Sequence, residues 1–545
     1  MPVSCGSSQK AGGSGGMGGM AGAGGATGPG GVSGAGATAG AGATAGAGGT
    51  AGAGGTAGAA TGGVAGSIQV EIPAFNNDLD LLFMIDNSPT MAAMQQKLVD
   101  RIPVFFQALQ KARTGLPNLH VAVVSSDLGA PGDSTSSIGC TATGDGGQFQ
   151  SLPRGTCAAT TLFNTSTYLS DVNGQSNFTD PIDQVLQCIT PLGVTGCGYE
   201  HQLASIDRAL GSDGAPPPAA NKGFLRSSAY LGIILLTNED DCSAPPDTTI
   251  FSLNGGAQSL SNPDGPLGRY RCNGGPRGGH LCKDPATGQM IVPPLTAPAN
   301  TTGNPPLLQL TDCRDNDTGS SALTPVSTFV QHIRALKADP DHKIMVAGIM
   351  TRPDPYGVMW IAAPASSPGV AGQLWPYVMH ECGATGDVNV NPMAEQHTTD
   401  GSVGDPGVRM TQFVSSFPYA VLASSCDPTY QSTMQAIASR LVALMASQSC
   451  VALGTVQNDA QGQPSCTVTT HLVDGSGNKT DVQVPSCAEN GGTAPCWTLF
   501  SDGTCPIGSQ ILYVTPDQAI TNATSQSTTL SCSLCQPGPF VMPGC

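Results

Sequence analysis

Residues 79–90 read LDLLFMIDNSPT, an apolar run that stops at a cluster of polar side chains. Only Asp80 interrupts the run, whose length is that of a strand buried on both faces of a sheet. After Thr90, apolar side chains recur at steps of three and four, which predicts an amphipathic helix over residues 91–109. Pro103 is expected to kink this helix. A buried strand, a polar turn and a helix in succession indicate one unit of an α/β sheet.

The same succession recurs along the chain, so one doubly wound domain is expected over residues 67–449. Further buried strands are predicted at residues 120–124, 231–236, 344–349 and 419–422, and further helices at 203–210, 323–337 and 434–444. Strands that alternate with helices predict an α/β fold with a mostly parallel sheet covered on both faces. The long segments between these elements contain cysteines and are expected to be insertions. Ligands of such sheets bind at the carboxyl ends of the strands, where this chain places its polar clusters.

The first polar cluster, Asp86-x-Ser88-x-Thr90, resembles the D-x-S-x-S/T motif that opens the metal-ion-dependent adhesion site of von Willebrand factor A domains. One carboxylate and two hydroxyls at alternate positions of a tight turn offer hard oxygen ligands, which Mg²⁺ and Ca²⁺ prefer. The resemblance extends over residues 78–449 and implies one bound Mg²⁺ or Ca²⁺ ion, whose coordination a partner's oxygen donor completes. The alternative is that the three side chains only cap the N-terminus of the following helix.

The chain departs from the family pattern at two later motifs. The second motif supplies a threonine before a helix, whereas residues 196–200 read GCGYE, with Glu200 as the nearest oxygen donor. The third motif is an aspartate after a strand, but Asn238 stands there, with Asp240 and Asp241 just beyond. An exposed loop is the alternative for these two aspartates, and additional carboxylates would favour Ca²⁺. The resemblance thus implies a variant metal site with the ligands Asp86, Ser88, Thr90, Glu200, Asp240 and Asp241.

The beginning of the chain has the composition of a linker. Residues 11–66 consist almost entirely of Gly, Ala, Thr and Ser, in variations on GAGATAGAGGT. This composition cannot bury enough apolar surface to order itself, so residues 1–66 are expected to contain a flexible tether. Val3 and Ser4 directly before Cys5 resemble the end of a bacterial lipoprotein signal. Cys5 is therefore the expected lipid anchor, and an incidental cysteine is the alternative.

Cysteine spacing indicates export. Of the 19 cysteines, ten lie from Cys140 to Cys426 and eight from Cys450 to Cys545. Even numbers in each region, without the spacing of a zinc site, predict disulfides within each region and an oxidising compartment. A small, disulfide-rich β domain is expected over residues 450–545. Its predicted strands are residues 467–473, 482–484 and 511–514.

Charge and missing motifs exclude several functions. The chain has 38 Asp and Glu against 21 Lys and Arg, a net charge of −17, which excludes nucleic-acid binding through a basic patch. No apolar run has the roughly 18 residues of a membrane span, so membrane contact is expected only through Cys5. Nucleophile-elbow and phosphate-loop motifs are missing too, so no enzymatic activity is expected.

We therefore predict a non-enzymatic binding or adhesion protein that engages a protein or a surface polymer through its divalent cation. It is expected to be exported, either to a bacterial outer membrane or cell surface through the lipid anchor, or as a secreted protein. Two alternatives remain open. One is a metal-free structural scaffold of the envelope, and the other is an exported metal-dependent hydrolase.

Overall fold

The computed structural model describes residues 67–73, 76–112, 115–130, 140–154, 166–251, 264, 270–362, 373–447, 450–452, 456–460, 462–474, 476–500, 509–515, 517, 520 and 525–535. The chain divides into two units, Met1–Val64 and Ala65–Cys545, and all described residues belong to the second. The expected lipid anchor Cys5 and the expected tether, residues 1–66, lie outside the described residues.

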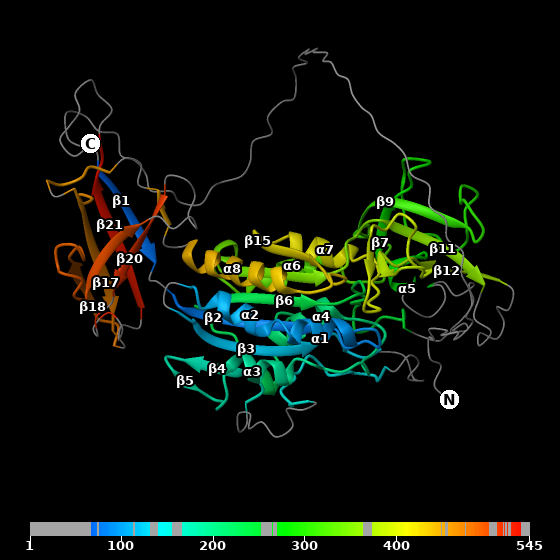
Figure 1. Ribbon diagram of the computed structural model, residues 1–545, viewed down its shortest axis with the longest axis horizontal. Coiled ribbons are helices and arrows are strands. Elements are labelled where there is room, and N and C mark those ends of the chain that lie inside the picture. The colour runs from blue at the N-terminus through cyan, green and yellow to red at the C-terminus, as the bar shows by residue number, and fades with distance from the viewer. Residues whose placement is uncertain are drawn as a thin grey trace, which may run out of the picture. The chain divides into compact units, whose positions relative to one another are not determined.

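A seven-stranded sheet forms the α/β domain, in the order β15-β10-β6-β2-β3-β4-β5 (Figure 1). Its parallel strands are β2 (Asp78–Ile85), β3 (Asn118–Ser125), β6 (Tyr230–Leu236), β10 (Ile344–Met350) and β15 (Tyr419–Ser424). The short strands β4 (Leu169–Val172) and β5 (Gln175–Ser176) add an antiparallel edge. The five predicted strands are therefore confirmed. The strand order reverses at β2, because β3 lies on one side of it and β6 on the other.

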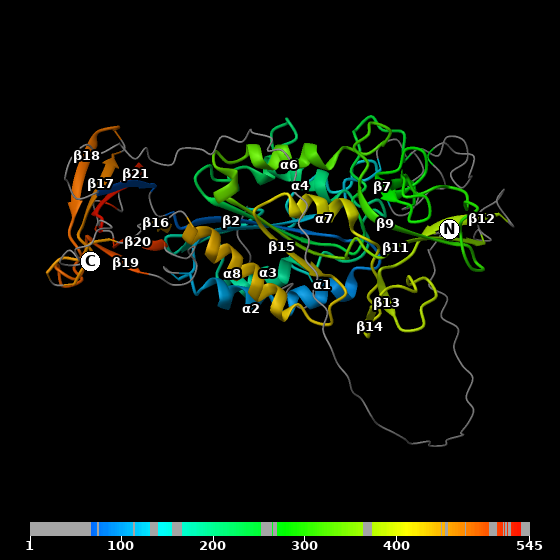
Figure 2. The same cartoon turned by 90° about the horizontal axis from the view of Figure 1, so that it is seen from above.

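Helices cover both faces of this sheet (Figure 2). One face carries α1 (Ala92–Val99), α2 (Ile102–Leu109), α3 (Ile182–Ile189) and α8 (Gln431–Ser447), and the other carries α4 (Gln202–Leu210), α6 (Val326–Ala335) and α7 (Val408–Ser415). Leu81 and Phe83 belong to the first core, and Leu82 and Met84 to the second. This division follows from the pleat, because successive side chains of a strand point to opposite faces.

The predicted single kinked helix over residues 91–109 is wrong, because α1 ends at Val99 and α2 begins at Ile102. Pro103 lies in the first turn of α2, where its missing N–H and fixed φ are tolerated. The proline therefore begins a second helix and does not bend one long helix. No helix in the described part of the chain is both long and apolar enough to cross a membrane.

The insertions form a second, five-stranded sheet in the order β12-β11-β9-β7-β8. Its antiparallel strands are β7 (His280–Lys283), β8 (Met290–Ile291), β9 (Leu307–Asp315), β11 (Tyr356–Ala362) and β12 (Leu374–Val378). The insertions also contain α5 (Tyr270–Asn273), β13 (Cys382–Ala384) and β14 (Gln396–Thr398). Disulfides within this region, as predicted, join Cys140–Cys197, Cys242–Cys272, Cys282–Cys313 and Cys382–Cys426.

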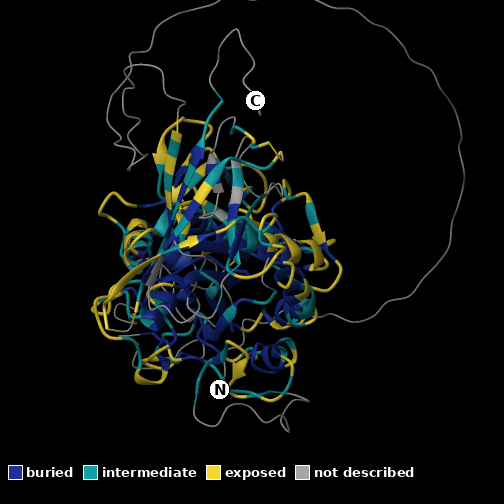
Figure 3. Ribbon diagram, turned by 90° about the vertical axis from the view of Figure 1, so that its left-hand side faces the viewer, coloured by how far each residue is buried: buried dark blue, intermediate teal, exposed yellow. Residues whose placement is uncertain are grey.

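Two antiparallel sheets that share one core form a further part of the structure, which we call the β domain. The first sheet has the order β1-β21-β17-β18, with β1 (Ser67–Pro73), β17 (Cys466–Val473), β18 (Lys479–Val484) and β21 (Ser525–Ser533). The second consists of β16 (Cys450–Ala452), β20 (Ser509–Thr515) and β19 (Cys496–Phe500). Buried and more exposed residues alternate along β1, β17 and β21, as expected for a sheet with one solvated face (Figure 3). Disulfides join Cys466–Cys532 and Cys487–Cys496, again within one region.

The first strand corrects the predicted domain boundary. Residues 67–73 are expected in the α/β domain, but β1 pairs with β21 along its whole length. The alternation of Ile68, Val70 and Ile72 places apolar side chains against the core of the β domain. The α/β domain, residues 78–447, is therefore an insertion between β1 and β16.

A chain that begins at Asp78 should have a less stable β domain than a chain that begins at Ser67. Removing β1 leaves one side of β21 unpaired and takes Ile72 out of the core, whose burial alone contributes about 1.5–3 kcal/mol. The unfolding midpoint in urea should fall, measured by fluorescence in a variant that keeps Trp497 as its sole tryptophan. The chain from Ser67 is the matched control, and equal midpoints would contradict the role assigned to β1.

Candidate functional site

The carboxyl ends of β2, β3 and β6 meet at Asp86. Its backbone N–H donates to the carbonyl of Leu236 at the end of β6 (2.9 Å). One carboxylate oxygen accepts from the Ser88 N–H (2.8 Å) and from the Ser126 hydroxyl (3.3 Å), and the other accepts from the Thr237 hydroxyl (2.7 Å). Polar side chains that follow three neighbouring strands thus converge on one buried carboxylate.

The helix-capping alternative for Asp86, Ser88 and Thr90 is wrong. Helix α1 has Met91 as its N-cap residue, and no side chain caps it. The Asp86 carboxylate accepts the Ser88 N–H inside its own loop, and the Thr90 hydroxyl accepts a hydrogen bond from Asn238 Nδ2 (2.9 Å). These side chains therefore join the loops at the strand ends and leave the helix uncapped.

Asp86 has no cationic partner among the described residues. Its side chain is 0% exposed, and all the hydrogen-bond donors that it meets are neutral. Burial raises the pKa of Asp86 above its ordinary value of 3.8, although the Ser88 amide and the nearby hydroxyls of Thr237, Ser88 and Ser126 offset part of this effect. A buried, ionised carboxylate without a cation is costly, so a bound cation would stabilise the folded chain.

Two buried amide oxygens near the loop after β2 have no hydrogen-bond partner among the described residues. They are Gln202 Oε1 and Asn238 Oδ1, and each residue is at most 1% exposed. Gln202 Nε2 donates to the Thr237 hydroxyl (3.0 Å), and Asn238 Nδ2 donates to Thr90, so both amides belong to the same cluster. Leaving such atoms unpaired costs free energy. Hydroxyl and amide oxygens are suitable ligands for a hard cation, and coordination would satisfy them.

Glu200 lines a separate cavity of about 10 Å³, roughly the volume that one water molecule requires. The other carboxylates that line it are Glu239, Asp240 and Asp405. Glu200 and Asp240 thus share this cavity, whose lining residues do not include Asp86 or Ser88. Over the described ranges, no three His, Cys, Asp or Glu side chains form a metal-binding group. A cation in the loop after β2 would therefore be held mainly by hydroxyl and amide oxygens.

Asp240 binds the N-terminus of α7. Its oxygens accept the N–H groups of Arg409 (2.9 Å) and Met410 (3.0 Å), and His280 Nε2 lies 2.7 Å from one of them. Burial alone would raise the pKa of Asp240, but His280 and the two amides lower it below the ordinary value. The exposed-loop alternative is wrong here, since Asp240 is 6% and Asp241 is 0% exposed. The structure gives Asp240 a role in fixing α7 and β7.

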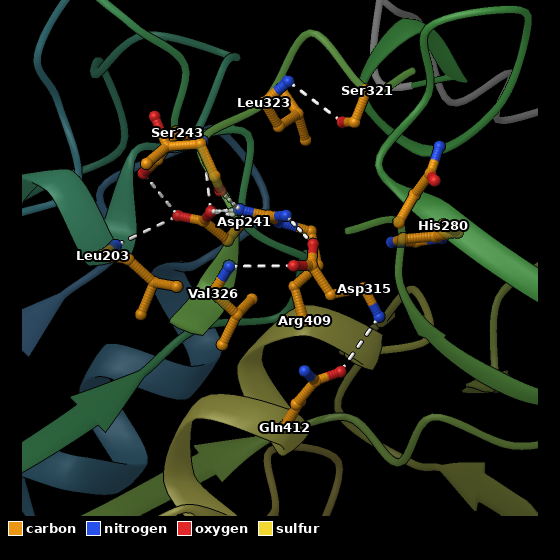
Figure 4. A network of polar contacts seen from close by, with 12 residues as sticks. Leu203, Asp241, Ser243, His280, Asp315, Ser321, Leu323, Val326, Arg409 and Gln412 are labelled. Atoms are coloured by element: carbon orange, nitrogen blue, oxygen red, sulfur yellow. Dashed lines mark hydrogen bonds and ion pairs between the residues drawn. The ribbon is translucent and has the colours of Figure 1, made fainter. Parts of the chain in front are cut away.

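Asp241 and Asp315 cap two further helices and share one guanidinium (Figure 4). Asp241 accepts the Leu203 N–H at the start of α4 (3.0 Å), and Asp315 accepts the Val326 N–H at the start of α6 (2.8 Å). Arg409, in the first turn of α7, donates to both aspartates, at 2.9 Å from Asp241. The N-cap residues of α4, α6 and α7 make no side-chain caps, so these aspartates provide the missing acceptors.

Some of these residues had a recognisable signal in the sequence and others did not. Ser126 belongs to a polar cluster directly after a predicted strand, and that position marks it as a candidate. Gln202 stands directly before a predicted helix, where nothing in its surroundings predicts contact with Thr237. Arg409 is a single arginine within VRMTQFV, and its partner Asp315 lies 94 residues away.

Comparison with known proteins does not assign a family. No model of a known protein family matches this chain, and no curated protein matches it. The chain is similar to the pilus adhesin RrgA from Streptococcus pneumoniae, at 10% identity and a TM-score of 0.18, with 86% of this chain and 58% of that chain covered. It is also similar to the three N-terminal domains of the type V pili tip protein Mfa5 from Porphyromonas gingivalis, at 12% identity and a TM-score of 0.20, with 86% and 64% covered. The chain thus spans less than two thirds of either structure, and TM-scores this low establish no shared fold.

Arg409→Met should lower the free energy of unfolding by about 3–5 kcal/mol, because it leaves two buried aspartates without their cation. Urea unfolding measures the loss. Arg334→Met is the matched control, because the pair between Arg334 and Asp341 is partly exposed and should contribute at most about 1 kcal/mol. Losses of similar size in the two variants would show that Arg409 does not hold the helices together.

Asp86→Asn should stabilise the cation-free chain, and by more as the pH rises above 3.8. Because burial raises the pKa of folded Asp86 above the unfolded value, protonation favours the folded state. The stabilisation that protonated Asp86 provides is present below the unfolded pKa and is lost as the pH rises through the folded pKa. Asparagine does not titrate, so the variant does not lose stability in this way. Urea unfolding in EDTA, from about pH 4 to about pH 8, measures the difference. The exposed residue Asp247, changed to Asn, is the control, and the same trend there would refute the assignment.

Proposed function

We propose that this chain is a binding protein of the cell surface that holds one divalent cation, Mg²⁺ or Ca²⁺, in the loop after β2. Asp86 carries this proposal, because its buried carboxylate has only neutral partners and lies among oxygen atoms without partners. The loop lies at the carboxyl ends of parallel strands, where the strand order reverses and open α/β sheets bind ligands. Its resemblance to the adhesion-site motif of von Willebrand factor A domains supports the same assignment.

The proposed ligands come from two loops and the first turn of α4. They are the Asp86 carboxylate, the Ser88 and Thr90 hydroxyls, Asn238 Oδ1 and Gln202 Oε1. Glu200 lines the separate cavity described above and stays outside this set. Asp240 and Asp241 stay outside this set, because protein donors already satisfy their carboxylates. Most of the proposed ligands are uncharged oxygens, so the mixture suits a hard cation without neutralising it.

Partner capture would follow from the charge that remains on the ion. With a single carboxylate in its shell, a divalent cation keeps most of its positive charge and attracts a carboxylate or another oxygen donor. Thr90 is exposed while Asp86 is buried, so a partner would reach the ion from the Thr90 side of the loop. We expect a protein or a surface polymer in this role, bound without chemical conversion.

Export is part of the proposal and rests on the disulfides. Bonds such as Cys140–Cys197 and Cys466–Cys532 form and persist in oxidising compartments. A lipid anchor at Cys5 and a tether over residues 11–66 would hold the two folded domains at the surface.

A metal-free structural protein is the second candidate, and the contacts of Asn238 favour it. Its Nδ2 donates to the Thr90 hydroxyl (2.9 Å) and to the carbonyl of Val403 (2.8 Å). The amide therefore joins three loops without any ion. An aspartate at this position could not make these two donations, although it would bind a cation more strongly.

Mg²⁺ or Ca²⁺ at one hundred times its dissociation constant should stabilise the chain by about 2.7 kcal/mol relative to EDTA. Asp86→Asn should abolish this stabilisation, and Asn238→Asp should tighten cation binding because it adds a second carboxylate. Thermal unfolding and calorimetric titration with each cation measure both effects.

Asp247→Asn is the control and should respond to cations as the unmodified chain does, because Asp247 is exposed. If neither cation shifts the unfolding temperature of the unmodified chain at millimolar concentration, the metal-free structural protein becomes the better assignment.

A further inference from the structure

The β domain contains a cavity whose lining residues include none from the loop after β2. Residues of β1, β17 and β21, together with Trp497 of β19 and two loops, line this cavity, whose volume is about 410 Å³. This volume falls within the roughly 300–1,000 Å³ of small-molecule sites. None of its lining residues belongs to the proposed cation site, so the two sites can be tested separately.

The side chains around this cavity are polar and carry no positive charge. Asp459 and Glu489 contribute carboxylates, Gln463 contributes an amide, and Ser531 and Ser533 contribute hydroxyls. No lysine, arginine or histidine is among the described residues that line it. An anionic ligand would therefore meet uncompensated negative charge, on a chain whose net charge is already −17.

Trp497 lies at the wall of the cavity. The residue is 4% exposed and packs in the core of the β domain with Val468 and Leu530, which holds the ring in place. Because so little of the ring is accessible, recognition of a ligand has to rest on the polar groups around it. We propose that this cavity binds a neutral carbohydrate.

The hydrogen-bonding groups of the cavity match those of a sugar. Sugar hydroxyls both donate and accept, and the cavity supplies donors in its serine hydroxyls and the Gln463 amide and acceptors in its carboxylates. An ammonium ligand would use the acceptors only, and one oxygen of Asp459 already accepts the Gln463 N–H (2.8 Å). This mixture therefore favours a polyhydroxylated neutral ligand over a cation.

The rim of the cavity is fixed before any ligand binds. The Asp459 N–H donates to the carbonyl of Gln463 (2.7 Å), and the Gln463 N–H donates back to the Asp459 carboxylate. Two disulfides fix the remaining wall and rim, Cys466–Cys532 between β17 and β21 and Cys487–Cys496 at the loop of Glu489. Groups that are already held in place lose little entropy on binding, which favours affinity for a ligand that relies on hydrogen bonds.

Titration of the full chain with three neutral trisaccharides, maltotriose, cellotriose and triacetylchitotriose, tests the proposal. In a variant that keeps Trp497 as its sole tryptophan, at least one sugar should change the fluorescence saturably, with a Kd of about 1 mM or lower. Glu489→Ala and Gln463→Ala should each weaken binding about tenfold or more. Asp481→Asn is the matched control on β18, because Asp481 does not line the cavity, and it should leave the Kd unchanged.

EDTA should not alter the sugar affinity, since the proposed cation site shares no residue with the cavity. The absence of saturable binding by all three sugars would overturn the proposal, and so would equal affinities for the cavity variants and the unmodified chain. Saturable binding of spermidine without binding of any sugar would also overturn it, because the cavity would then be a site for cations.

Discussion

The buried guanidinium of Arg409 sets the arrangement of the loops at the carboxyl end of the large sheet. It is 0% exposed and pairs with Asp241 after β6 and with Asp315 at the end of β9. Those two aspartates accept amide N–H groups in the first turns of α4 and α6, and Asp240 accepts two in the first turn of α7, the helix that carries Arg409. Negative charge at a helix N-terminus is favourable, but the aspartates are close to one another and buried. The Arg409 guanidinium offsets the repulsion between Asp241 and Asp315 and so helps the three helix ends to lie together.

The ion pairs and hydrogen bonds of Arg409, Asp240 and Asp241 also help to position the candidate cation site. Thr237 and Asn238 lie on the same loop as Asp240 and Asp241, so the contacts of the two aspartates restrain the loop that carries Thr237 and Asn238. Thr237 then donates to Asp86. Asp240 and Asp241, which resemble ligands in the sequence, thus support the candidate site, while the groups that contact the Asp86 carboxylate are neutral.

Local patterns in the sequence predicted the elements but not their long-range partners. The apolar runs of β2, β6 and β10 are recognisable because both faces of these strands are buried, and the loop after β2 is recognisable because its polar residues are consecutive. Local sequence patterns could not predict the ion pair between Asp241 and Arg409, because the two residues lie 168 positions apart in the chain. The same limit applies to β1, whose alternating side chains indicate a strand but do not reveal that β21, at the other end of the chain, pairs with it.

Asp80 and Asp86 lie near the two ends of the same strand, both 0% exposed, and differ in their partners. Asp80 meets Arg226 Nε at 2.8 Å and Lys337 Nζ at 3.9 Å, whereas Asp86 meets only neutral donors. A proton or a metal ion can supply the positive charge that Asp86 lacks. A proton would neutralise one carboxylate oxygen and leave Asn238 Oδ1 without a partner, while a metal ion can coordinate several of these oxygens at once. If a cation binds in the loop after β2, as we propose, the unpaired oxygens near Asp86 would help to complete its coordination.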